Sequence, residues 1–289
     1  MGYRVVEVTS HGKLEYSLNY LIYRTVDQTT KIFLDEVETL IVESTSVAIT
    51  SALLNELIKR KINVIFCDEK HNPASQLIPF YGSHDTSLSI YKQLSWTEET
   101  KDTVWKYIVQ QKIFWQGAVL DKYRPGEGNF LHSYVSQVQD GDTTNTEGHC
   151  AKYYFNRLFG NGFNRKDDKD KRNAYLNYGY ALILSQVSRS ITNKGYLTPL
   201  GIHHKNQFNE FNLACDLMEP FRPIVDDMAN KVGDGDFKDQ MVRVLQCNVK
   251  IRDSYQTLIH AIDIYVASVL KSLSDNNPRE ILFYTSYEL

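Results

Sequence analysis

The sequence predicts an α+β protein: a small N-terminal β-rich domain followed by a larger all-α domain. The chain has 289 residues, which is enough for two domains. Short apolar runs with turn residues between them fill it to about residue 85, a spacing typical of strands. Beyond residue 95 the apolar residues recur three and four apart, as in helices. We therefore expect a β-rich domain over 1–85, a linker over 86–95 and an α-helical domain over 96–289.

The N-terminal domain is expected to hold several short strands and one helix. YRVVEV and KLEYSL flank a four-residue turn, which predicts a hairpin with His11 at its tip. The other predicted strands are YLIYRT, KIFL, ETLIVES and INVIFCD. Between the last two, Leu53 and Leu57 fall on one face of a predicted helix, which should pack against the strands.

Two capping-box patterns, in which Ser or Thr precedes Glu by three residues, predict helix starts in the second domain. They are Ser95 with Glu98 and Thr144 with Glu147. The helix after Thr144 should stop at Gly160, because glycine commonly ends helices.

Three more helices are predicted further along, one ending at Gly195 and two between residues 236 and 274. The mixed-charge run 164–173 before them is typical of a solvated loop, and contact with DNA is the alternative.

The composition excludes some classes of protein. A hydrophobic content of 42% indicates a globular chain, and no stretch approaches the roughly 20 apolar residues of a membrane span. The N-terminus lacks a signal-peptide pattern, so we expect a cytoplasmic protein with no membrane contact. The net charge of −3 argues against a protein that coats nucleic acid through bulk charge.

One candidate site residue is Glu219, which lies in a segment of helical spacing. Phe211, Cys215 and Glu219 are four apart, so a helix here would place Glu219 on its apolar face before Pro220 interrupts the hydrogen bonding. An inward carboxylate needs a positive partner, which is either Arg222 or a metal ion.

Two further candidates are Glu147 and His204. Glu147 would face inward from its helix, and the alternative is that it only closes the capping box with Thr144. His204 follows His203 in a loop after Gly201, where a histidine is usually solvated. An imidazole with two carboxylates is a ligand set for Mg²⁺ or Mn²⁺, and such sites commonly serve phosphoryl chemistry.

The cysteines are scattered and form no C-x-x-C pair, so no zinc knuckle or redox dithiol is indicated. Burial as small apolar residues is the simplest interpretation of each. A zinc site that draws on Cys150 beside His149, or on Cys215 beside Asp216, stays as an alternative to the Mg²⁺ or Mn²⁺ site.

The segments TEGHCAKYYF and GIHHKNQFNEFNLACDLMEPFRPIVD resemble the CRISPR spacer-acquisition integrases, the Cas-one family. That family has a glutamate at the start of a helix, then Gly-x-x-His, then Asp-Leu-Met-Glu-x-Phe-Arg-Pro, and this chain has each part in order. The resemblance extends over essentially the whole chain. INVIFCDEKHNP and LIPFYGSHDTSL resemble the subgroup of type II-A loci.

The resemblance implies that Glu147, His204 and Glu219 are the metal ligands and catalytic residues, with Asp216 in a supporting position behind them. We also expect DNA contacts. Lys205 and Arg222 adjoin proposed ligands and would hold the DNA backbone. His11 would stack on the end of the protospacer duplex, which the family's N-terminal domains bracket.

The implied activity is metal-dependent transesterification, which joins protospacer 3′-hydroxyls to the repeat of a CRISPR array beside its leader. The implied assembly is a homodimer, two copies of which flank a Cas-two dimer in a heterohexameric complex. Its other partners would be double-stranded protospacer DNA, leader–repeat DNA and the other adaptation proteins of a type II-A locus.

Two alternatives to this function remain. One is a stand-alone metal-dependent phosphohydrolase, for which the pair His84 and Asp85 is the only indication. The other is a non-catalytic DNA-binding scaffold with the same fold.

Overall fold

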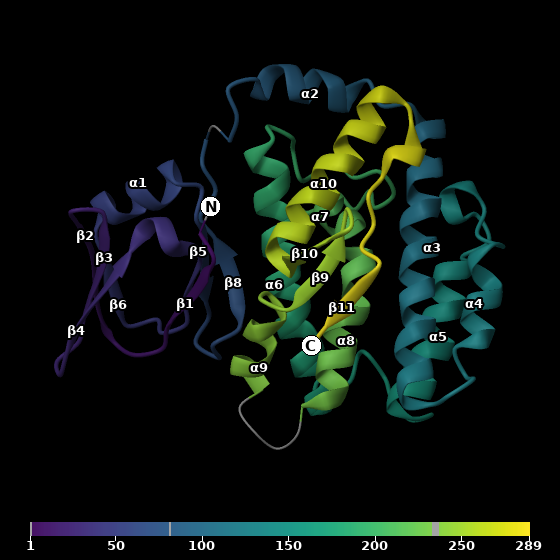
Figure 1. Cartoon of the computed structure of the whole chain (residues 1–289), viewed down its shortest axis with the longest axis horizontal. Helices are drawn as coiled ribbons and strands as arrows, with labels where there is room; N and C mark the ends of the chain where they lie inside the picture. Colours follow the sequence, from purple (N-terminus) through teal and green to yellow (C-terminus); the bar gives the residue numbers. More distant parts are fainter. Residues whose placement is uncertain (1, 81, 233–236) are drawn as a thin grey trace. The chain divides into compact units, whose positions relative to one another are not determined.

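The computed structural model describes residues 2–80, 82–232 and 237–289. They divide into two compact units, residues 1–81 and 82–289 (Figure 1). The first unit is built mainly of strands and the second mainly of helices, so the predicted α+β class is confirmed.

The first unit contains two four-stranded sheets. In one, with the order β1-β5-β7-β8, the strands β1, β5 and β7 run parallel and β8 is antiparallel to β7. Its bounds are β1 Arg4–Val8, β5 Val37–Val42, β7 Asn63–Cys67 and β8 Pro73–Gln76. The other has the order β4-β3-β2-β6. Its bounds are β2 Gly12–Ser17, β3 Tyr20–Arg24, β4 Thr29–Phe33 and β6 Val47–Ile49. A 3-10 helix, η1 Leu34–Glu36, joins β4 to β5.

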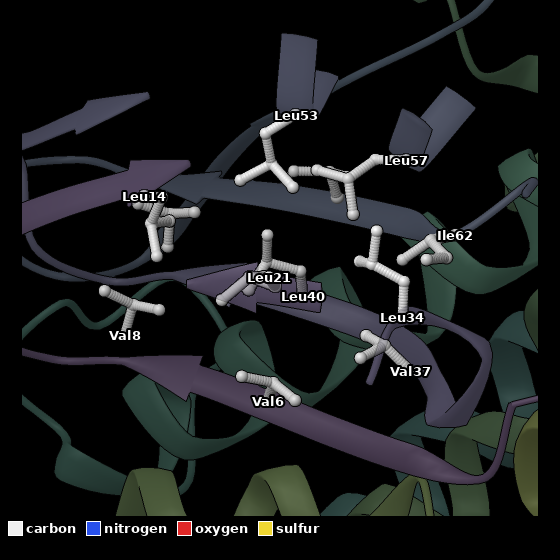
Figure 2. Packing of buried hydrophobic residues seen from close by; sticks show 12 residues of the cluster. Val6, Val8, Leu14, Leu21, Leu34, Val37, Leu40, Leu53, Leu57 and Ile62 are labelled. Carbon is white, nitrogen blue, oxygen red and sulfur yellow. The ribbon is translucent and has the colours of Figure 1, made fainter. Parts of the chain in front are cut away.

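The core of this unit lies under helix α1, Ser51–Lys59. Figure 2 shows Leu53 and Leu57 of that helix pointing toward Leu21 and Leu40 of the strands, and all four side chains are fully buried. All of β5 is buried as well, because it lies between β1 and β7 and is covered on both faces.

The predicted hairpin between the first two strands is wrong, because β1 and β2 belong to different sheets. β1 pairs in parallel with β5, and β2 pairs with β3 and β6. His11 is exposed in the connection between the two sheets. Gly12 is needed for close approach rather than for a turn, since a Cβ there would lie 2.5 Å from the carbonyl oxygen of Arg24.

The second unit is organised around long helices. α3 packs against α4 and α5, and α6 packs against α7, α8, α9 and α10 (Figure 1). The bounds are α2 Thr86–Leu94, α3 Glu98–Tyr123, α4 Asn129–Val135, α5 Thr146–Phe159, α6 Lys171–Asn193, α7 Asn212–Met218, α8 Arg222–Lys231, α9 Phe237–Val244 and α10 Leu258–Asp275. Short 3-10 helices lie at η2 Asp140–Asp142, η3 Glu219–Phe221 and η4 Pro278–Glu280. Among the described residues, none of these helices has the length and apolarity needed to cross a membrane.

This helical unit also contains a small antiparallel sheet, which was not expected from the sequence pattern. It has the order β10-β9-β11, with bounds β9 Asn248–Ile251, β10 Ser254–Thr257 and β11 Ser286–Glu288. Arg252 and Asp253 form the turn between β9 and β10, both with positive φ (52° and 61°). Two-residue turns of this kind usually carry Asn or Gly, so Arg252 and Asp253 are a weak signal for a hairpin.

Residues 86–95, expected to be a linker, form helix α2 within the second unit. The side chain of Gln93 holds α2 in place, because its amide donates to the carbonyls of Leu197 and Leu200. The predicted cap of the next helix is wrong by two residues: Thr97 accepts from the Thr100 amide, while Ser95 ends α2. The charged run before α6 is mostly exposed up to residue 169, as expected of a solvated loop.

Candidate active site

Two of the predicted ligands meet at one lysine. The ammonium of Lys112, in the middle of α3, donates to Oε1 of Glu147 and to Oε2 of Glu219, the latter at 2.5 Å. The side chains of Lys112 and Glu219 are buried, at 9% and 7% exposed, and that of Glu147 is 28% exposed, so the cluster is open to solvent on the side of Glu147. Burial alone would lower the pKa of Lys112, but the charges of Glu219 and Glu147 raise it, and the ammonium stays charged.

Glu147 reaches this lysine because another carboxylate caps its helix. The two oxygens of Asp142, in η2, accept from the backbone amides of Thr146 and Glu147 at 2.8 and 3.0 Å. The predicted capping box of Thr144 with Glu147 is therefore wrong, and the Thr144 hydroxyl pairs with that of Thr146. Because Asp142 satisfies the helix N-terminus, the Glu147 side chain is available to the site.

Glu219 starts η3, where the chain passes from α7 to α8 around Pro220. Its Oε1 accepts from Nε of Arg222 at 2.8 Å, so the predicted partner is present. The Arg222 guanidinium also lies over the ring of Tyr180, 4.5 Å from its centroid. Burial alone would raise the pKa of Glu219, but the charges of Arg222 and Lys112 lower it to about 2. Glu219 is therefore a buried carboxylate that keeps its charge.

Asp216 organises the loop that carries His204. Its carboxylate is fully buried and accepts from the backbone amides of Ile202, His203 and His204 at 2.7, 3.1 and 3.1 Å. The same carboxylate meets Nδ1 of the His204 ring at 2.5 Å, and this hydrogen bond raises the pKa of His204. The contact leaves Nε2, on the opposite edge of the ring, as the atom that can bind an ion.

Trp105 holds the same loop against α3. The ring of His203 stacks on the indole at 4.2 Å with an interplanar angle of 6°, and His204 meets it edge-on at 5.8 Å. Burial lowers the pKa of His203, so this ring is neutral in the stack. Helix α3 thus supplies both the lysine between the carboxylates and the platform under the histidine loop.

The chemistry of these donors fits a hard divalent cation. The two carboxylates converge on a position that accepts positive charge, since the Lys112 ammonium lies there. An imidazole whose other nitrogen is held by a carboxylate is a common metal ligand. Within residues 2–80, 82–232 and 237–289, no three His, Cys, Asp or Glu side chains lie close enough together to hold an ion as they stand. Binding of an ion would thus need the side chains to move.

The thiols near the site are not suited to zinc. Burial raises the pKa of Cys150 to about 12 and also raises that of Cys215, which disfavours the thiolate form that zinc binds. The His84–Asp85 pair lies at the start of α2, where Asp85 accepts from the Ser83 hydroxyl.

The predicted DNA-binding residues fall in three different settings. Lys205 is exposed and pairs with Glu98 at 3.0 Å. It adjoins an open cleft of about 350 Å³ that His204 also lines. Arg222 is turned inward onto Glu219, and His11 belongs to the other unit. Lys205 is therefore the one of these residues that the structure places at an accessible surface beside a proposed ligand.

Sequence comparison relates the chain to known proteins. The model of the family described as CRISPR associated protein Cas1 matches residues 6–244. The CRISPR-associated endonuclease Cas1 of Neisseria meningitidis serogroup C (strain 8013) is 31% identical over 297 residues, which cover 97% of this chain and 95% of the relative. These matches do not bear on the type II-A subgroup, which stays a prediction.

Solved structures share the fold. A casposase bound to integration product superposes with a TM-score of 0.77 at 18% identity, covering 94% of this chain and 91% of that chain. A chain of a Cas6-RT-Cas1–Cas2 complex gives a TM-score of 0.75 at 17% identity, covering 96% of this chain and 36% of that chain. At these identities the likeness concerns the fold alone.

Proposed function

The chain belongs to the Cas1 family of CRISPR-associated proteins, and we propose that it is a metal-dependent DNA integrase and endonuclease of CRISPR adaptation. It joins the 3′-hydroxyls of a protospacer to the repeat of a CRISPR array by transesterification. The relative from Neisseria is named an endonuclease, which supports action on nucleic acid. The structural neighbour bound to integration product supports joining as well as cutting.

The observation that carries the proposal is the convergence of Glu147 and Glu219 on the ammonium of Lys112. A carboxylate withdrawn from water, as Glu219 is, is costly unless a cation balances it, and two carboxylates that converge on one position favour a functional site. Beside them, the loop of His204 is fixed by Asp216.

We assign Glu147, Glu219 and Nε2 of His204 as the ligands of Mg²⁺ or Mn²⁺. When bound, the ion would stabilise charge on the phosphate oxygens and lower the pKa of the attacking hydroxyl. Asp216 orients the imidazole, and Arg222 holds Glu219 in place. Lys205, at the mouth of the cleft that His204 lines, is suited to contact the DNA backbone. Joining exchanges one phosphodiester for another, so no nucleotide cofactor is needed.

We infer that the protein acts as a homodimer with a Cas2 partner. The structural neighbour titled as a Cas6-RT-Cas1–Cas2 complex supports the association with Cas2. A net charge of −3 suits a DNA-binding surface that is completed by assembly rather than by one chain. His11 of the N-terminal unit, which is exposed, stays a proposed contact to the protospacer end.

The test is half-site integration with the Cas2 partner, protospacer duplex, leader–repeat DNA and Mn²⁺. Replacing Glu147, His204 or Glu219 by Ala should lower the rate by more than the roughly 10- to 100-fold that loss of an outer hydrogen-bond partner costs. Double variants should be little worse than single ones, because the ligands act as one unit.

A matched control is Glu280→Ala, since Glu280 is a surface glutamate paired with Lys271 at 2.8 Å. It should integrate at the wild-type rate. A Glu219→Ala variant with near wild-type activity would show that the site assignment is wrong. A wild-type protein that binds DNA but never joins it would indicate a scaffold, and hydrolysis of small phosphoesters without Cas2 would indicate a phosphohydrolase.

A further inference from the structure

Lys112 occupies an unusual position for a lysine. It lies in the middle of helix α3, its side chain is 9% exposed, and its ammonium contacts two carboxylates from other elements. Lysine is rarely buried to this degree, because the cost of removing a charge from water is large. The ion pairs with Glu147 and Glu219 offset that cost.

The charges of the four side chains linked by these ion pairs balance without any metal. Lys112 and Arg222 supply two positive charges, and Glu147 and Glu219 supply two negative charges. A divalent ion that binds both carboxylates brings two further positive charges into a buried site. Excess charge of this kind is unfavourable until anions compensate it, and the phosphates of DNA are the available anions.

Resting on the proposed function, we propose that Lys112 is an internal counter-ion that competes with the divalent ion for Glu147 and Glu219 and so couples metal binding to DNA binding. Without DNA, the ammonium neutralises the carboxylates and keeps the metal weakly bound. When DNA arrives, its phosphates offer the ammonium a new partner, and the carboxylates are released to the ion. Lys112 is thus a positioning residue of the site.

The experiment measures binding of Mn²⁺ alone by calorimetry, in wild type and in Lys112→Met. The variant removes the competing ammonium, so its Mn²⁺ affinity without DNA should rise by about tenfold, within the range usual for coupled sites. Adding a protospacer duplex should tighten Mn²⁺ binding in the wild type and should change it much less in the variant. Lys112→Gln, which keeps a hydrogen-bond donor but no charge, should behave like Lys112→Met and serves if the methionine variant folds poorly.

A second readout needs no metal. In EDTA, Lys112→Met should melt at a lower temperature than the wild type, because the buried Glu219 and the partly buried Glu147 lose their shared cation. Mn²⁺ should raise the melting temperature of the variant by more than it raises that of the wild type.

The matched control is Lys122→Met on the same helix. Lys122 pairs with the fully buried carboxylate of Asp227 at 2.6 Å, so this change also breaks an ion pair to a buried acid. It should lower the melting temperature but leave the Mn²⁺ affinity at the wild-type value. This comparison separates loss of stability from loss of competition.

Equal Mn²⁺ affinity in the wild type and both Lys112 variants would overturn the inference. If the wild type then still integrates DNA with Mn²⁺, only the role of Lys112 has failed. If no variant binds Mn²⁺, with or without DNA, and the wild type does not integrate, the proposed function has failed as well.

Discussion

Buried carboxylates in this protein differ in the partners that surround them. Glu219 has two cationic partners, Lys112 and Arg222, and the pKa of its carboxyl falls to about 2. Asp216 accepts three backbone amides and the His204 ring. Asp226, on helix α8, forms no ion pair with any side chain in the described part of the chain, and burial raises its pKa to about 7.

The surroundings of Asp226 explain why its pKa does not rise further. The hydroxyl of Tyr180 donates to its Oδ1, and this hydrogen bond lowers the pKa. The charges of Arg222 and Lys112 lower it further. The carboxyl group of Asp226 therefore stays protonated in the folded protein up to about pH 7, whereas in an unfolded chain it ionises near its ordinary pKa of 3.8.

This difference predicts a stability that falls with pH. Between about pH 4 and pH 7 the folded state binds one more proton at Asp226 than the unfolded state, so the free energy of unfolding should fall by up to about 1.4 kcal/mol per pH unit and then level off. Asp226→Asn should remove this slope, because the amide does not titrate. Urea denaturation of both proteins from pH 4.5 to pH 8.5 measures the effect.

Tyr180→Phe provides the control for this assignment. It removes a hydrogen bond that favours the charged form of Asp226, so the falling part of the profile should extend to higher pH. If Asp226→Asn keeps the slope of the wild type, another group is responsible for it.

At the scale of one element, helix α5 depends on Asp142. The carboxylate of Asp142 satisfies two amides at the helix start, those of Thr146 and Glu147. Asp142→Ala should lower the free energy of unfolding by about 1 to 2 kcal/mol, the usual cost of a lost N-cap. It should also reduce integration, because the N-terminus of α5, which carries Glu147, is then no longer held in place. Urea denaturation measures the first effect and half-site integration the second.

Thr144→Ala is the matched control, because Thr144 is the cap that the sequence pattern indicated. Its hydroxyl contacts only that of Thr146 among the described hydrogen bonds, and its loss should change stability by less than about 0.5 kcal/mol. If Thr144→Ala costs as much stability as Asp142→Ala, the capping assignment is wrong.

The same helix shows what local patterns can and cannot predict. The start near residue 146 and the stop at Gly160 follow from nearby residues, and both were predictable. The cap was not, because Asp142 reaches the helix from η2, outside the four-residue pattern. The pairing of β1 with β5 was missed for a similar reason: it joins residues more than thirty positions apart, and the short turn after β1 suggested a hairpin.

In the molecule as a whole, the candidate site combines residues that lie in recognisable sequence motifs with a residue that only the packing brings to the site. Glu147, His204 and Glu219 lie in motifs that a reader of the sequence can find. Lys112 has no motif, since nothing around it in α3 distinguishes it from other lysines of a long helix. Only the packing of α3 against α5 and η3 brings its ammonium to both carboxylates.

Each unit has its own apolar core, and this leads to a prediction about metal removal. The leucines of the first unit and the buried faces of α3, α6 and α10 in the second are apolar side chains, which pack through burial and not through metal coordination. Lys112 and Arg222 already balance the site carboxylates. Protein treated with EDTA should therefore keep its far-ultraviolet circular dichroism spectrum and a cooperative melting transition, unlike domains whose folding depends on zinc.

Integration activity should respond differently from the fold. It should be lost in EDTA and return with Mn²⁺, because the proposed ion would act in the reaction and not in folding. Cys150→Ser and Cys215→Ser should stay active, since burial raises the pKa of both thiols and the proposed ligand set includes neither. Metal analysis of the purified protein completes the test. Stoichiometric zinc that is lost together with activity on replacing either cysteine would contradict this assignment, and with it the role proposed for Glu219 as a ligand of a hard divalent ion.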